Sequence, residues 1–177
     1  MRTLHRKYVE KFDINLIYNE NGREDLQGNM EINQDNLREG MNGTSALIEG
    51  GWYFNNYPKM REMFPDHDIH YIVLNPSLDT IHSNYLKRHP NSKKHETNDF
   101  ENWDKTIYMV RYKSAKKLLD NPEVTTLELT NESLEEKITA VLNLVHNNND
   151  KTIFVITGSN CAGKSTLYKN VKQRLEF

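Results

Sequence analysis

Apolar positions along the chain fall into short runs that predict β-strands, separated by segments with helical spacing. Strands are predicted at residues 14–20, 45–51 and 69–77, and the last is a continuous apolar run of the kind that a parallel sheet buries on both faces. Two more are predicted at 125–130 and 151–157. These segments are therefore the expected strands of one sheet.

Between the strands, apolar residues recur every three to four positions, which is typical of amphipathic helices. The helix predicted at 131–149 is a clear case, and either Asn131 or Ser133 can cap it. Strands that alternate with helices predict a three-layer α/β/α domain around a mainly parallel sheet. The other predicted helices cover residues 2–12, 57–65, 78–88, 101–120 and the segment that carries Leu167, Val171 and Leu175.

Length and composition restrict the class of protein. A chain of 177 residues is long enough for one domain with a sizeable core, and the formal charge of -2 argues against non-specific nucleic-acid binding. Cys161 is the single cysteine, which excludes an internal disulfide and fits a reducing compartment. No apolar run approaches the roughly 20 residues of a membrane span, and no secretory signal is recognisable. We therefore expect a cytoplasmic protein without a membrane partner.

The most specific chemical signal is the segment ITGSNCAGKST at 156–166, which contains the pattern G-x-x-x-x-G-K-S. Glycines let the backbone wrap closely around an anion, so that successive N–H groups point at phosphate oxygens, and the following helix directs its positive end there. Lys164 is expected to reach the β- and γ-phosphates of ATP, and the Ser165 hydroxyl to bind Mg²⁺. The predicted nucleotide-binding residues are Gly158, Ser159, Asn160, Cys161, Ala162, Gly163, Lys164, Ser165 and Thr166.

The competing interpretation of this segment is a glycine turn between a strand and a helix. The apolar strand before it and the periodic helix after it favour phosphate binding instead. Cys161 lies near the predicted start of that helix, beside its positive dipole end, so a reactive thiol is a further prediction.

The chain resembles the P-loop kinases of the nucleoside and nucleotide kinase group, in circularly permuted order. HYIVLNPSLDTIHSNYLKRH resembles the strand and helix that lead into the family's lid, IYMVRYKSAKKLL the helix that leaves it, and TTLELTNESLEEKITAVLNLV the usual C-terminal strand and helix. The resemblance implies a single kinase-like domain over 1–177. Residues 1–147 then supply the acceptor, lid and C-terminal-type elements, with the lid at about 86–103, and 151–177 supply the phosphate-loop unit that usually comes first.

Two rival interpretations concern the C-terminal unit. Residues 151–177 could begin a truncated second domain, or they could complete the sheet of a neighbouring chain, which would make a homodimer.

A circular permutation of the kinase fold is physically reasonable. Termini of α/β domains usually lie at the surface, and joining them elsewhere preserves the internal contacts.

The resemblance also implies residues that contact the phosphate acceptor. In an open parallel sheet, functional groups gather at the carboxyl ends of the strands. Glu20 ends the first predicted strand and is the candidate catalytic base, with Arg23 and Glu24 as further acceptor contacts. Glu49 ends the next strand, where the family often has an acidic residue near Mg²⁺ or the acceptor. The chain departs from the family in lacking both an Asp-Arg pair after Glu49 and an Asp-ended Walker B strand, so no subfamily is assigned.

Aromatic and basic residues complete the predicted site. Trp52 and Tyr53 follow Glu49 and could stack on an acceptor base, although ordinary packing is an equal alternative. Arg88 and Arg111 flank the predicted lid, where resembling kinases use arginines to neutralise charge on the transferring phosphoryl group. The alternative for both is a solvated basic loop.

The expected activity is an ATP- and Mg²⁺-dependent kinase whose acceptor is a nucleoside or nucleoside monophosphate. Two other acceptors stay open within this enzyme class, a polynucleotide 5′-hydroxyl and a small sugar-like molecule. A nucleotide-binding regulatory NTPase is the alternative of another class, and a non-catalytic binding module is less consistent with the intact run from Gly163 to Ser165.

Overall fold

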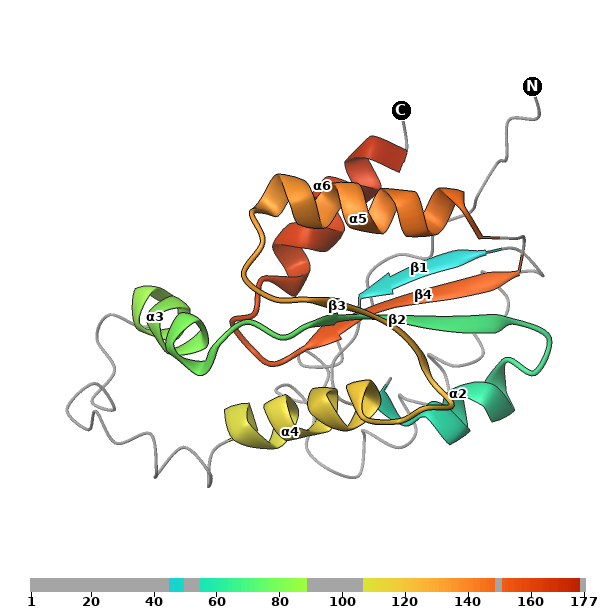
Figure 1. Cartoon of the computed structure of the whole chain (residues 1–177), viewed down its shortest axis with the longest axis horizontal. Coiled ribbons are helices and arrows are strands. Elements are labelled where there is room, and N and C mark those ends of the chain that lie inside the picture. Colours follow the sequence, from blue (N-terminus) through green and yellow to red (C-terminus); the bar gives the residue numbers. More distant parts are fainter. Residues whose placement is uncertain (1–44, 50–54, 89–106, 149–150, 176–177) are drawn as a thin grey trace, which may run out of the picture.

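The protein is represented by a computed structural model that describes residues 45–49, 55–88, 107–148 and 151–175, with backbone only for 107–111. The described strands form one four-stranded sheet in the order β1-β4-β2-β3, and every pairing is parallel (Figure 1). The strands are β1 (Ala46–Glu49), β2 (Asp68–Leu74), β3 (Thr125–Leu129) and β4 (Thr152–Gly158), and the helices are α2 (Tyr57–Met63), α3 (Leu78–Arg88), α4 (Ile107–Leu119), α5 (Leu134–His146) and α6 (Lys164–Leu175).

The C-terminal strand β4 lies inside the sheet. Ile153 is opposite Ala46 of β1 on one side and Ile69 of β2 on the other, so β4 is hydrogen-bonded along both edges. All seven of its residues are buried, which matches the apolar run that predicts a fully covered parallel strand. The segment 151–175 is therefore an integral part of this domain.

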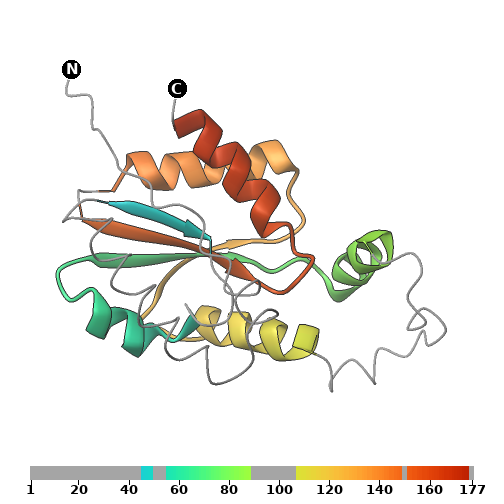
Figure 2. The same cartoon turned by 180° about the vertical axis from the view of Figure 1, so that it is seen from behind.

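Helices cover both faces of the sheet. Alternate residues of β4 point in opposite directions, so that Val155 faces α2 and α4 while Phe154 and Ile156 face α5 and α6. Figures 1 and 2 show these two helix pairs on opposite sides of the strands. The predicted α/β class with a parallel sheet is thus confirmed for the described residues, and the arrangement is compatible with three layers.

Helix α3 lies apart from the two helix layers, beyond the carboxyl ends of the strands (Figure 1). It follows β2 through residues 75–77 and spans Leu78–Arg88, as the sequence predicts. Its buried residues Ile81 and Tyr85 pack against Cys161 of the loop that follows β4. The carboxyl edge of the sheet is therefore covered by α3 at the point where β4 ends.

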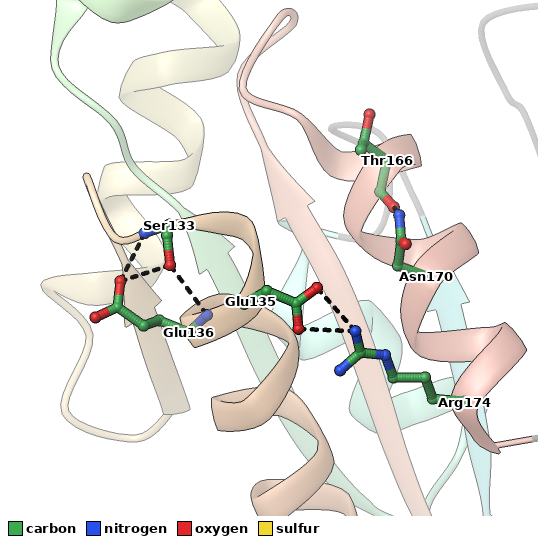
Figure 3. A network of polar contacts seen from close by, with 6 residues as sticks. All are labelled: Ser133, Glu135, Glu136, Thr166, Asn170 and Arg174. Atoms are coloured by element: carbon green, nitrogen blue, oxygen red, sulfur yellow. Dashed lines mark hydrogen bonds and ion pairs between the residues drawn. The ribbon is translucent and has the colours of Figure 1, made fainter.

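Helix α5 begins with a capping box that identifies Ser133, and not Asn131, as its cap. The Ser133 hydroxyl accepts a hydrogen bond from the Glu136 amide at 3.3 Å, and the Glu136 carboxylate accepts from the Ser133 amide at 2.8 Å (Figure 3). Hydrogen bonds from the Ser133 hydroxyl and amide lower the pKa of the exposed Glu136 carboxyl. One turn of polar side chains thus fixes where α5 starts.

An ion pair joins α5 to α6 on the outside of their layer. Arg174 donates two hydrogen bonds from one guanidinium nitrogen to the Glu135 carboxylate, at 2.7 and 2.8 Å (Figure 3). Both side chains are exposed, so the pair adds little to the stability of the fold.

The predicted helix 2–12 and strand 14–20 lie outside the described residues. Among the described helices, none combines the length and apolar character that crossing a bilayer demands.

Candidate functional site: the phosphate loop and Glu49

The phosphate loop, residues 158–165, begins with a glycine that the fold requires. Gly158 has φ +142°, and a Cβ atom at this position would lie 2.4 Å from the backbone oxygen of Leu74. Any side chain would therefore force β4 away from β2. The first glycine of the motif thus allows the loop to leave the sheet while the strand pairing continues to its last residue.

The loop turns back through two further residues with positive φ. Gly163 has φ +95°, which favours glycine, whereas Cys161 adopts φ +62° with a side chain attached. Helix α6 begins directly after Gly163, and its first turn and positive dipole end are directed at the loop. Backbone N–H groups at a helix N-terminus can bind phosphate groups, so this arrangement makes the loop a candidate anion site.

Lys164 lies over the loop that it belongs to. Its Nζ donates hydrogen bonds to the backbone oxygens of Gly158 at 3.1 Å and Ser159 at 2.7 Å. These contacts hold the ammonium group against the loop backbone. A phosphate group within the loop would therefore meet a positive charge that is already in position.

A hydrogen bond between Ser165 and Glu49 joins α6, near the end of the described residues, to β1, near their start. The Ser165 hydroxyl donates a hydrogen bond of 2.8 Å to Oε1 of Glu49, across a sequence separation of 116 residues. Glu49 is the last residue of β1, lies opposite Ile156 of β4 and is only 5% exposed. Pairing β1 with β4 therefore places a buried carboxylate beside the first turn of α6.

The oxygens of Ser165 and Glu49 form a donor set that suits Mg²⁺. This ion takes oxygen ligands, usually one or two from the protein, and completes its shell with water and substrate phosphates. Within the described ranges, no group of three or more His, Cys, Asp or Glu side chains gathers into a larger metal-binding cluster. A hydroxyl and one carboxylate next to a phosphate loop fit a Mg²⁺ that arrives with a nucleotide.

Asn55 links the end of β4, directly before the phosphate loop, to α4, and no motif in the sequence pointed to it. Its Oδ1 accepts a hydrogen bond from the Thr157 hydroxyl at 2.5 Å, and its Nδ2 donates to the Ser114 hydroxyl at 3.3 Å. Thr157 is fully buried and directly precedes Gly158. The start of the loop is therefore tied to the helix that follows the predicted lid.

Asn84 of α3 is a second contact that the sequence did not reveal. Its Nδ2 donates a hydrogen bond of 3.0 Å to the backbone oxygen of Cys161. The Cys161 side chain is 5% exposed and packs against Ile81 and Tyr85. The predicted reactivity of this thiol requires access for a reagent, and the packing of α3 removes that access.

The remaining predicted residues are not brought into this arrangement by the described structure. Arg88 is exposed and ends α3, and Arg111 lies in the part of α4 for which only the backbone is described. The other acceptor and lid positions are outside the described residues, namely Glu20, Arg23, Glu24, Trp52, Tyr53 and the lid from residue 89 to residue 103.

Comparisons of the chain with models of known protein families, with curated proteins and with solved structures gave no match. A function therefore has to be inferred from the chemistry of the site.

Proposed function

We propose that the protein is an ATP- and Mg²⁺-dependent phosphotransferase that acts on a nucleoside or nucleoside monophosphate. The observation that supports this most strongly is the 2.8 Å hydrogen bond between Ser165 of the phosphate loop and the buried carboxylate of Glu49. A simple glycine turn needs neither a buried carboxylate nor a lysine held over the loop. Both are expected if the loop binds a triphosphate with its metal ion.

Each residue of the site has a defined task in this proposal. The loop amides and the start of α6 bind and orient the phosphates, and Lys164 neutralises charge on the β- and γ-phosphates. Glu49 and Ser165 would hold Mg²⁺, which neutralises negative charge on the phosphate oxygens when it is bound. Phosphoryl transfer depends mainly on such positioning and charge neutralisation, so that the loop and Glu49 together supply the donor half of the site.

The acceptor half of the proposal depends on the resemblance to P-loop nucleoside and nucleotide kinases. Glu20 would accept the proton of the attacking hydroxyl, Arg88 and Arg111 would neutralise the transferring group, and Trp52 and Tyr53 would stack on the base. Permuted element order is supported by β4 lying between β1 and β2, because the phosphate-loop strand then joins the sheet of its own chain.

Transfer of labelled phosphate from ATP tests the proposal. The protein is incubated with Mg²⁺, γ-labelled ATP and a panel of nucleosides, nucleoside monophosphates, a 5′-hydroxyl oligonucleotide and small sugars. We expect labelled product with a nucleoside or its monophosphate, and at least about a hundredfold less with Lys164→Ala, because a transition-state charge stabiliser is lost. Lys169→Ala, on the same helix, is the matched control and should retain activity.

The other outcomes of this assay separate the alternatives. Label only on the oligonucleotide or only on a sugar would replace the proposed acceptor but keep the kinase class. ATP hydrolysis without transfer to any acceptor would favour a regulatory NTPase and contradict the proposal. Undiminished transfer by Lys164→Ala would reject the assignment of the phosphate loop.

A further inference from the structure

Helix α3 contacts the phosphate loop at its most constrained residue. Cys161 has φ +62°, a left-handed conformation that is unfavourable for a residue with a Cβ. Such a conformation persists only when the surrounding structure fixes it. Here two contacts with α3 do so, namely the packing of the Cys161 side chain and the hydrogen bond of 3.0 Å from Asn84 to the Cys161 oxygen.

The hydrogen bond from Asn84 also fixes the direction of a loop amide. The Cys161 carbonyl and the Ala162 N–H belong to one planar trans peptide, in which the two groups point in opposite directions. Holding the carbonyl toward α3 therefore turns the Ala162 N–H toward the inside of the loop. There it donates to the backbone oxygen of Ser159 at 3.4 Å, a long bond that a phosphate oxygen would replace at little cost.

We propose that Asn84 is a positioning residue for phosphate binding, which acts by holding the Cys161–Ala162 peptide in the orientation that presents its N–H to a phosphate. This inference rests on the proposed function, because it requires the loop to bind a polyphosphate. Asn84 comes from α3, the helix that leads into the predicted lid, and is 77 residues from Cys161 in the chain. The phosphate loop is thus completed by a side chain from a distant segment.

A double-mutant cycle tests this inference, with inorganic triphosphate and Mg²⁺ as the probe. Asn84→Leu keeps the branched shape of the side chain but cannot donate, so we expect about fivefold to tenfold weaker binding of triphosphate, as for the loss of one hydrogen bond. Glycine adopts positive φ without strain, so Cys161→Gly should not need the support from Asn84. In the Cys161→Gly background, Asn84→Leu should therefore weaken binding by less than about twofold.

Two controls distinguish positioning from a general loss of structure. Ser83→Ala changes the exposed neighbour of Asn84 on the same helix and should leave binding unchanged. Urea unfolding of each variant shows whether the loss of binding follows the loss of stability. A purely structural Asn84 would weaken binding equally in both backgrounds, and this result would overturn the inference.

The failure of the proposed function has a different signature. If the unaltered protein binds neither triphosphate nor ATP, both the proposed function and the role of Asn84 are wrong. If the unaltered protein binds triphosphate and Asn84→Leu binds it equally well, only the role of Asn84 is wrong. Weaker binding that Cys161→Gly restores would support both.

Discussion

The buried carboxylate of Glu49 is the side chain on which the proposed chemistry depends most. At the end of β1 it is 5% exposed, and burying a carboxylate costs free energy that must be offset by hydrogen bonds or a cation. Its hydrogen bond to Ser165 orients one oxygen toward the first turn of α6. We infer that the negative charge, and not only the hydrogen bond, is the functional property of this residue.

Replacing Glu49 by glutamine separates these two properties. The amide oxygen of Glu49→Gln can still accept the hydrogen bond from Ser165, but the charge is gone. We expect the Mg²⁺ concentration for half-maximal activity to rise about tenfold or more, because Mg²⁺ prefers carboxylate ligands. The measurement is a magnesium titration of phosphate transfer at saturating ATP. Glu123→Gln, at an exposed position, is the control, and an unchanged magnesium requirement in Glu49→Gln would remove Glu49 from the metal site.

At the scale of elements, the candidate site is built from residues at the end of β1 and at the start of α6. The parallel register places Glu49 opposite Ile156, which brings it within reach of Ser165 at the start of α6. Helix α6 then packs on α5, whose start is fixed by its capping box. The orientation of α6 thus depends on its packing against α5.

The cap of α5 can be tested by a pair of alanine variants. Both Asn131 and Ser133 are suitable capping residues by type, but only Ser133 makes the two reciprocal contacts with Glu136. Ser133→Ala should lower the free energy of unfolding by about 1 kcal/mol. Asn131→Ala should change it by less than about 0.5 kcal/mol. Urea unfolding measures both, and a larger effect at Asn131 than at Ser133 would show that the helix begins elsewhere.

At the scale of the whole molecule, the C-terminal strand and helix complete a domain that begins much earlier in the chain. Strand β4 is paired on both sides, and its side chains enter the cores of both faces. Without β4, β1 and β2 would have no pairing to each other, since they are joined only through it. The phosphate loop is therefore held by the centre of the sheet.

Local patterns predicted much of this arrangement. Apolar runs located all four described strands, helical spacing located α3 from its first to its last residue, and the glycine-lysine motif located the loop. The contacts from Asn84 and Asn55 were not predictable, because they join residues 77 and 102 positions apart and asparagine has no periodic signature. The positive φ of Cys161 was not predictable either, because a cysteine, unlike a glycine, does not indicate a left-handed backbone conformation.

The central claim is that the C-terminal segment forms an interior strand and places a phosphate loop beside Glu49. Hydrogen–deuterium exchange with and without ATP and Mg²⁺ tests this claim most directly. The amides of residues 153–157 should exchange as slowly as those of β2, because both strands are paired on two sides. ATP with Mg²⁺ should further slow exchange in the phosphate loop, residues 158–165. Rapid exchange of 153–157, or a loop whose exchange ATP leaves unchanged, would contradict the account.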